Sequence, residues 1–233
     1  MKKLTLAVAL AGALAASASV QAQTLTSNEE KISYSLGVLI GENLKQDFDK
    51  LNLDAFRAGV ATVYGQNAEL MSGEEIGETL QAFQVQRMEE QRAAFQKMAD
   101  DNLKAGKDYQ AANAKKRGVK TTASGLQYEQ LSAGRGASPK ASDVVKVHYR
   151  GQLTDGTEFD SSYARGEPVS FPLSGVIPGW TEGLQLMKAG EKARLVIPSD
   201  LAYGPGGMGN AIGPNETLVF EVELLEVNPD MAQ

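Results

Sequence analysis

The residues of this chain that could do chemistry are aromatic and aliphatic side chains that stand beside a few polar groups. Phe159 and Asp160 are adjacent at the end of a predicted β-hairpin, and Tyr149 lies on its first strand. Trp180 begins a predicted helix, and Tyr203 lies in a loop rich in glycine and proline. An apolar pocket with few polar groups binds and orients an apolar part of a ligand. The alternative is that these residues only form the core of a small domain. The set consists of Tyr149, Phe159, Asp160, Val176, Ile177, Trp180, Tyr203, Ile212 and Phe220.

Several other chemistries are excluded by the residue types. The chain has one histidine, His148, and no cysteine. This composition excludes metal clusters built from histidine and cysteine, and it excludes disulfides and thiol chemistry. Gly204, Gly206 and Gly209 have the spacing of a dinucleotide-binding loop, but Pro214 follows and no helix begins there. We therefore expect no metal and no cofactor, and we interpret His148 as a residue of the outer strand face.

The charge of the chain also limits its partners. The formal net charge is −6, and acidic and basic residues are spread over both halves. A protein that binds nucleic acid usually presents a clustered basic surface. We expect no nucleic-acid partner. The hydrophobic fraction of 42% is typical of a globular protein.

Residues 1–22 have the pattern of a cleaved secretory signal peptide. Lys2 and Lys3 give a positive start, and the apolar run that follows is too short to span a bilayer. Val20 and Ala22 form a small-x-small cleavage pattern. The sequence therefore predicts export to the periplasm, with the outer cell surface as the alternative.

Residues 23–72 are predicted to form two amphipathic helices. Ser27 and Glu30 are spaced for a capping box at the start of the first helix. Asn52 or Asp54 can cap the second helix. Two helices bury little apolar area alone, so we expect this region to form a homodimer, and the alternative is a monomeric helical cap. The apolar positions are Ile32, Leu36, Leu39, Ile40 and Leu44 in the first helix, and Leu53, Phe56, Val60 and Val63 in the second.

Residues 73–118 are predicted to form one long connecting helix. Ser72 and Glu75 have the spacing of another capping box, whereas Gly106 and Asn113 weaken the pattern and allow a break near residue 106. Most positions beyond the first turns are polar or charged. Such a helix either bridges through solvent or is covered by a partner.

Residues 119–233 change to the pattern of a β-rich domain. All 8 prolines of the chain lie in this part, and apolar residues alternate with polar residues in several segments. Asp155 and Gly156 predict a tight turn between two strands. One helix is predicted between Pro178 and Gly190. The predicted fold class is α+β, in which an antiparallel sheet wraps on one short helix and follows an all-α region and a long connecting helix.

Three segments of this domain are similar to a known family. VHYRGQLTDGTEFDSSY, VIPGWTEGLQLMKAGEKARLVIPSDLAYG and GPNETLVFEVELLEV resemble the signature segments of the FKBP-type peptidyl-prolyl cis-trans isomerases. The resemblance extends from Ser124 to Val227. The signal peptide, the N-terminal helices and the long helix resemble the Mip-like and FkpA-like bacterial branch of that family. In that branch the N-terminal helices form an intertwined homodimer.

The resemblance implies roles for individual residues. It implies that Asp160, Tyr203 and Tyr149 are the catalytic residues. Three positions depart from the best-known small members, namely Val169, Met208 and Ala211, and these put substrate preference and the affinity for macrolide inhibitors in question. It implies that the proline-binding residues are Phe159, Arg165, Val176, Ile177, Trp180, Ile212 and Phe220.

The function implied is isomerisation of X–Pro peptide bonds in proteins that fold after export. Rotation about this bond is slow enough to limit folding. An apolar pocket can favour the twisted amide without a covalent step. The alternative function is a client-binding chaperone dimer in which isomerase activity is secondary. A third hypothesis, an inactive scaffold of the same fold, is disfavoured because the polar residues of the pocket are all present.

Overall fold

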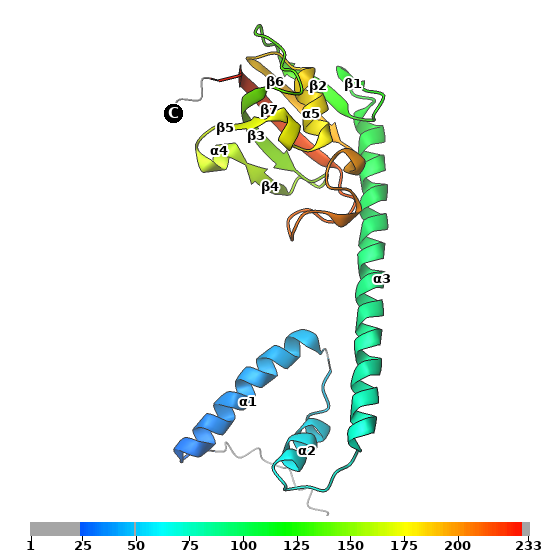
Figure 1. Cartoon of the computed structure of the whole chain (residues 1–233), viewed down its shortest axis with the longest axis vertical. Coiled ribbons are helices and arrows are strands. Elements are labelled where there is room, and N and C mark those ends of the chain that lie inside the picture. Colours follow the sequence, from blue (N-terminus) through cyan, green and yellow to red (C-terminus); the bar gives the residue numbers. More distant parts are fainter. Residues whose placement is uncertain (1–23, 49, 230–233) are drawn as a thin grey trace, which may run out of the picture. The chain divides into compact units, whose positions relative to one another are not determined.

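A computed structural model describes residues 24–48 and 50–229 (Figure 1). The predicted signal peptide, residues 1–22, lies outside the described residues. The chain divides into two compact units, and the boundary lies between Glu75 and Ile76. Each unit is described by itself below.

The N-terminal unit contains helices α1, Asn28–Asp47, and α2, Leu53–Val63. The Ser27 hydroxyl accepts a hydrogen bond from the Glu30 backbone N–H at 3.1 Å, and the Glu30 carboxylate accepts from the Ser27 N–H at 2.9 Å. The predicted capping box is therefore confirmed. The side chain of Asn52 caps α2, which settles the choice that the sequence left open.

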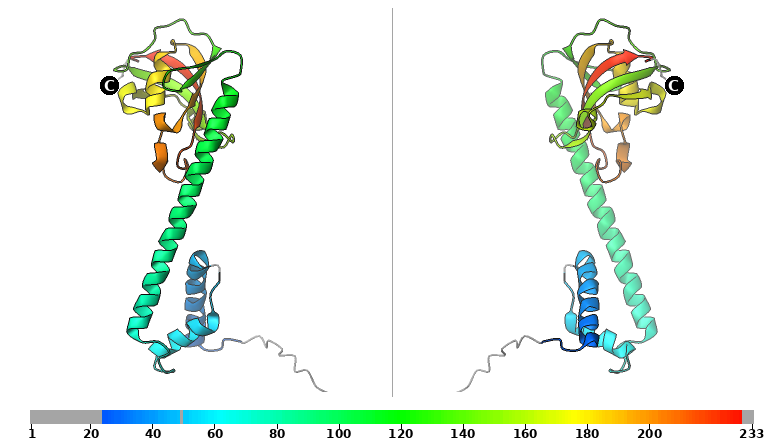
Figure 2. Two further views of the ribbon diagram at one scale, coloured as in Figure 1. Left: turned by 90° about the vertical axis from the view of Figure 1, so that its right-hand side faces the viewer. Right: turned by 90° about the vertical axis from the view of Figure 1, so that its left-hand side faces the viewer.

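Helix α3, Gly73–Asn113, is continuous for 41 residues, as the sequence predicted, but it ends five residues before the predicted limit at Gly118. The break that Gly106 allowed does not occur. The buried residues of α3 are Ala99, Gly106 and Asn113, all in its C-terminal part, which lies along the β-domain in both views of Figure 2. The polar residues of this part of α3 therefore include residues that contact the β-domain.

The C-terminal unit is built on one antiparallel sheet. The strand order is β1-β2-β6-β7-β3-β4, and β5 pairs with the first half of β3. Strands β1, β4 and β5 are short, whereas β3 and β7 form the long central pair. The strands are β1 Val119–Thr121, β2 Gln127–Ser132, β3 Val144–Gln152, β4 Glu158–Ser161, β5 Val169–Pro172, β6 Glu191–Ile197 and β7 Leu218–Val227.

Helix α5, Pro178–Gln185, covers the inner face of this sheet. Pro178 at its first position lacks an N–H that the helix could not have used. Leu184 and Met187 have no exposed surface and pack among inward-facing residues of β6 and β7. A four-residue helix, α4, Ser162–Arg165, follows β4. The 3₁₀ segments are Leu173–Gly175, Ser199–Leu201 and Gly204–Gly206.

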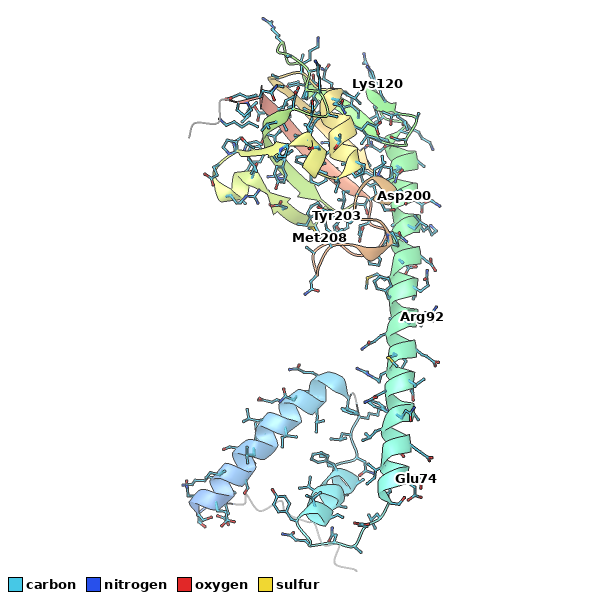
Figure 3. All side chains as sticks on the ribbon, in the orientation of Figure 1. Glu74, Arg92, Lys120, Asp200, Tyr203 and Met208 are labelled. Carbon is cyan, nitrogen blue, oxygen red and sulfur yellow. The ribbon has the colours of Figure 1, made fainter. Side chains whose placement is uncertain are left out.

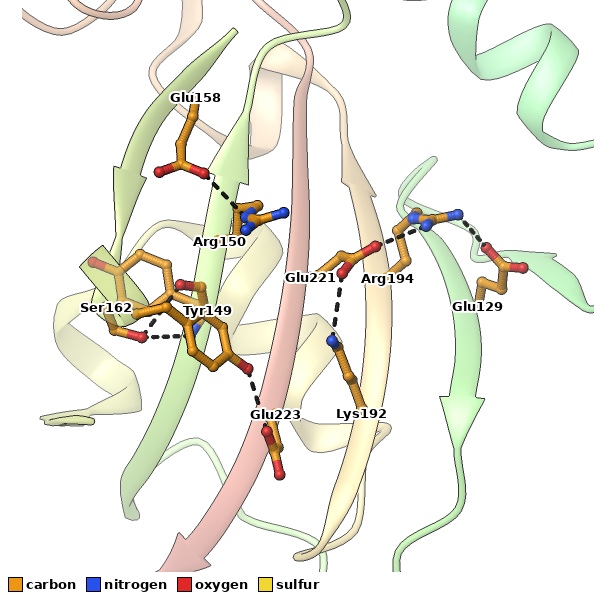
Figure 4. A network of polar contacts seen from close by, with 10 residues as sticks. Glu129, Tyr149, Arg150, Glu158, Ser162, Lys192, Arg194, Glu221 and Glu223 are labelled. Carbon is orange, nitrogen blue, oxygen red and sulfur yellow. Dashed lines mark hydrogen bonds and ion pairs between the residues drawn. The ribbon is translucent and has the colours of Figure 1, made fainter. Parts of the chain in front are cut away.

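The outer face of the sheet carries charged pairs between neighbouring strands (Figure 4). Arg194 on β6 donates to Glu221 on β7 at 2.7 Å and to Glu129 on β2 at 3.2 Å. His148 is half-buried on the same face, where its ring stacks on Tyr163 with centroids 4.6 Å apart. Pairs of this kind help to fix the register of the strands.

No helix in the part of the chain that the structure describes is both long enough and apolar enough to cross a membrane.

The packing of α5 predicts unequal effects of two leucine substitutions. Leu184→Ala should lower the free energy of unfolding by about 2–5 kcal/mol, because it leaves a cavity in the core. Leu186→Ala, next to the end of the same helix, should cost much less, because Leu186 is 48% exposed. Denaturant unfolding followed by the fluorescence of Trp180, the only tryptophan of the chain, measures both. Equal losses would contradict the position of α5.

Candidate active site

One cavity of about 460 Å³ lies between the sheet, α5 and the segments that connect the strands. Eight of the ten residues that the sequence singled out line it, and four further residues complete the lining. The eight are Tyr149, Phe159, Asp160, Val176, Ile177, Trp180, Tyr203 and Phe220. The four are Val169, Phe171, Gly175 and Met208.

Trp180 forms the most buried aromatic surface of this cavity, together with Phe220. Its side chain is only 5% exposed. The rings of Tyr149 and Phe220 meet the indole nearly at right angles, with centroids 5.1 and 5.0 Å away, and Phe171 lies at 5.2 Å. Edge-to-face contacts of this kind stabilise aromatic pairs beyond the area they bury. The indole is therefore held in one orientation on three sides.

One wall of the cavity depends on a glycine in β3. Gly151 lies between Asp160 on β4 and Phe220 on β7. A Cβ atom at this position would lie only 2.7 Å from the rings of Phe159 and Phe220. The two rings can therefore close over the backbone of β3, with centroids 5.5 Å apart.

The polar side of the cavity is a triangle of three side chains. The Tyr149 hydroxyl donates to one Asp160 carboxylate oxygen, and Arg165 Nη1 donates to the other. Arg165 Nη2 donates to the Tyr149 hydroxyl oxygen at 2.8 Å. Arg165 lies on α4 outside the cavity and is exposed. Its contact with the site therefore runs through Asp160 and Tyr149.

The triangle controls the charge of the site. Burial alone would raise the pKa of Asp160, but hydrogen bonds from Tyr149 and Arg165 and the guanidinium charge bring that pKa below its usual value. Burial raises the pKa of Tyr149, and its bond to the carboxylate adds to the effect. Burial and the nearby Asp160 charge also raise the pKa of Tyr203. At neutral pH the site therefore holds one carboxylate and two protonated phenols.

The backbone of Tyr149 is fixed by a residue that the sequence did not single out. Ser162 is fully buried, and its hydroxyl accepts from the Tyr149 N–H at 2.8 Å and donates to the Tyr149 carbonyl at 3.2 Å. The side chain continues the pairing that β4 stops making at Ser161, as Figure 4 shows. The only sequence signal for this contact is a pair of serines at the end of a strand.

Tyr203 and Met208 reach the cavity from the segment between β6 and β7 (Figure 3). No described residue forms a hydrogen bond with the Tyr203 hydroxyl, so this donor is free to meet a ligand. Met208 is 43% exposed at the rim. Ile212 pairs with Met208 through two backbone hydrogen bonds, but its side chain is buried in the core and does not line the cavity. The position of Ile212 therefore differs from the expected pocket position.

The structure also adds residues to the cavity and places the three positions that depart from the family pattern. Phe171 and Gly175 line the cavity but were not predicted, because β5 has only four residues and Gly175 lies in the 3₁₀ segment that follows it. Val169 and Met208, which depart from the family pattern, both line the cavity, whereas Ala211 is exposed and does not.

Comparison with known proteins gives a consistent result along the chain. Residues 136–225 match the family model described as FKBP-type peptidyl-prolyl cis-trans isomerase, and residues 29–129 match the domain amino terminal to it. The isomerase FkpA of Escherichia coli is 48% identical over 209 residues, which are 87% of this chain and 77% of that protein. The outer membrane protein MIP of Legionella longbeachae is 41% identical over 97% of both chains. The crystal structure of Escherichia coli FkpA matches with a TM-score of 0.78 and 46% identity, covering 88% of this chain and 99% of that one.

The lowered pKa of Asp160 predicts how its pairing contributes to stability at different pH values. A carboxylate with a depressed pKa in the folded state stabilises the fold fully above its unfolded pKa, about 3.9, and loses this contribution as the pH falls through the folded pKa. Wild type should therefore exceed Asp160→Asn in unfolding free energy by a constant amount above about pH 5, and the difference should shrink at lower pH. Denaturant unfolding between pH 3 and 7 measures it. A difference that does not change with pH would contradict the paired carboxylate.

Proposed function

We infer the function from the cavity and from the family to which the chain belongs, the FKBP-type peptidyl-prolyl cis-trans isomerases. The chain is accordingly a peptidyl-prolyl cis-trans isomerase. Its substrates are proline-containing segments of unfolded or partly folded proteins. The observation that carries this assignment is a largely apolar cavity, closed by Trp180, into which one free phenol and one ionised carboxylate project.

The cavity favours the twisted form of the X–Pro bond. Rotation about a peptide bond has a barrier of roughly 18–20 kcal/mol because amide resonance is lost. The planar amide is more polar than the twisted amide, so transfer into a water-poor apolar site disfavours the planar form more. The proline ring packs on Trp180, and Phe159 and Phe220 bound it on the sheet side. Val176 and Ile177 bound it on the side of α5.

The polar residues orient the substrate and take no covalent part. The Tyr203 hydroxyl donates to a substrate carbonyl, since it is protonated and has no partner among the described residues. Asp160 stands near the carbonyl that turns, and Tyr149 and Arg165 hold its carboxylate in place. A preorganised group loses no energy in reorienting as the charge distribution of the substrate changes.

Loss of the polar residues should lower the rate without unfolding the protein. Tyr203→Phe and Asp160→Asn should each reduce kcat/KM for an X–Pro peptide by roughly 10-fold, the effect of about one hydrogen bond in the transition state. A protease-coupled peptide assay measures this. Tyr163→Phe is the matched control, because Tyr163 is an exposed tyrosine whose hydroxyl bonds Glu223 on the outer face. An inactive wild type, or equal activity in all variants, would contradict the proposed site.

The N-terminal unit supports a homodimer. None of the residues between 24 and 75 whose burial is described is buried. Exposed apolar side chains occur on both helices, and two helices without a core cannot offset the conformational entropy of folding. A second copy of the same unit would cover these faces. They include Ile32, Leu36, Leu39 and Ile40 on α1 and Leu53, Phe56, Val60 and Val63 on α2.

A charge on these faces should dissociate the dimer. Phe56→Glu places a carboxylate where we propose an apolar interface, so the mature protein should sediment as a monomer at micromolar concentration while wild type sediments as a dimer. Gln66→Glu adds the same side chain at an exposed polar position after α2 and should leave the dimer intact. A monomeric wild type would contradict the proposal.

The alternative function, binding of unfolded clients, is favoured by one observation. Met88, Phe95 and Met98 on α3 are 61%, 49% and 51% exposed. Methionine side chains adapt to many partners. The Phe56→Glu variant separates the two functions, because isomerase activity on a short peptide needs one cavity only. If this variant isomerises normally but no longer suppresses aggregation of an unfolded protein, client binding requires the dimer.

We propose the periplasm as the site of action, since the first 22 residues have the signal-peptide pattern. One relative carries the name outer membrane protein, so the outer surface is the alternative location. The apolar cavity is also the place where a macrolide inhibitor would bind.

A further inference from the structure

We propose that helix α3 positions the active site through a clasp formed by Asn102 and Asn215. Asn102 lies on α3, and Asn215 lies at the end of the rim loop, residues 203–217, which carries Tyr203 and Met208. The proposal rests on the proposed function in one respect, since it takes this cavity as the site of isomerisation.

The two asparagines donate hydrogen bonds in opposite directions between α3 and the rim loop. Asn102 Nδ2 donates to the Pro214 carbonyl of the rim loop at 2.9 Å. Asn215 Nδ2 donates to the Ala99 carbonyl of α3 at 3.3 Å. Pro214 and Ala99 are buried and the two asparagines are half-buried, so each bond is partly shielded from water. Hydrogen bonds in such surroundings are expensive to leave unmade.

The backbone at Asn215 links the clasp to Tyr203. Asn215 has a φ of 57°, the left-handed conformation that asparagine adopts more readily than most residues. In this conformation its N–H donates to the carbonyl of Gly204 at 2.9 Å. Gly204 directly follows Tyr203 in the chain. The clasp therefore reaches the start of the rim loop as well as its end.

The middle of the rim loop has few other supports. Met208 and Ile212 pair through backbone hydrogen bonds of 2.8 and 3.2 Å, and Ile212 is 1% exposed in the core. Met208 itself is exposed at the rim. The middle of the loop is thus fixed from within by the buried side chain of Ile212, and the end of the loop is fixed by α3.

A second contact extends the same surface of α3 to β7. Gln110 Nε2 donates to the Thr217 hydroxyl at 2.9 Å. Gly106 lies opposite Thr217, and a Cβ atom on Gly106 would come within 2.3 Å of the Thr217 hydroxyl oxygen. Thr217 immediately precedes β7, which carries Phe220. The helix therefore contacts the segments that supply Tyr203, Met208 and Phe220 to the cavity.

The contacts of Asn102, Asn215 and Gly106 could serve stability alone. Two features favour positioning. The contacts are polar and directional, whereas the core of the domain is closed by apolar residues from the sheet and α5. The bonds of both Asn102 and Asn215 also join α3 to the rim loop, whereas the bonds between α3 and β2 come from Gln110 and Asn113, which pair with Gln127. We therefore assign Asn102 and Asn215 as positioning residues that act through the rim loop.

Removal of either side chain in the full-length mature protein tests the clasp. Asn102→Ala removes a donor and raises helix propensity, and Asn215→Gly removes a donor but keeps the left-handed backbone accessible. Each should lower kcat/KM for X–Pro peptides roughly 3- to 10-fold, because small displacements of positioned groups are costly in rate. Each should also shift the fluorescence of Trp180, the only tryptophan, which lies in the cavity.

A matched pair of glycine substitutions on α3 separates positioning from helix stability. Gly106→Ala inserts a methyl group against Thr217 and should lower kcat/KM, whereas a Cβ on Gly77 meets nothing within 4 Å. Both substitutions raise the helix propensity of α3. Gly77→Ala should therefore isomerise like wild type and leave the Trp180 fluorescence unchanged.

The outcomes are distinct. An active wild type with Asn102→Ala, Asn215→Gly and Gly106→Ala as active as Gly77→Ala would overturn the clasp and leave the proposed function intact. Losses that disappear at a temperature where all variants are fully folded would also overturn it, because the role would then be structural. An inactive wild type would instead refute the proposed function. Losses that persist in folded variants, together with the fluorescence shift, support the clasp.

Discussion

The packing of Trp180 against the aromatic residues of the sheet is the interaction on which the site depends. Trp180 and Phe220 are each 5% exposed, so they belong to the core as well as to the cavity. These residues therefore form both a core and a pocket, because the cavity lies at an edge of the core that other side chains do not fill. Protein cores are close-packed and resist deformation. A site built from the core inherits this rigidity and needs no ligand to form.

The charge of Asp160 is compatible with this apolar site because its partners come from other elements. Tyr149 reaches it from β3 and Arg165 from α4, and together they occupy both oxygens of the carboxylate. Ser162 fixes the backbone of Tyr149 from the start of α4. A buried charge without such partners would shift its pKa upward and become neutral. The short helix α4 thus has a large effect for its size, since it supplies both the cation and the serine.

The parts that could be predicted from sequence are those that local patterns determine. The capping residues Ser27 and Asn52, the turn at Asp155 and Gly156, and the long strands follow from neighbours in the chain, and the structure contains all of them. The resemblance to a known family supplied Arg165, which no local pattern would have selected. The parts that could not be predicted depend on distant contacts. Strands β1 and β5 have only three and four residues, too few for alternation to distinguish a strand from a loop. Ile212 turns into the core because its backbone pairs with Met208, a contact that spacing along the sequence does not reveal.

Helix α3 shows most clearly why a sequence pattern can leave two interpretations open. Its polar composition suited either a spacer in solvent or a helix covered by a partner. In the structure its C-terminal part is covered by the chain's own domain, and the polar residues Asn102, Gln110 and Asn113 are used for hydrogen bonds there. A polar helix surface costs little free energy when it is exposed to solvent. When it is buried, it specifies one position of the helix, because each hydrogen-bond donor needs a particular acceptor. An apolar surface would have held the helix as firmly but would have allowed it to slide. For a helix that lies against the rim of a site, a fixed position matters more than a gain in binding free energy, and this is the physical reason for a polar sequence at a buried contact.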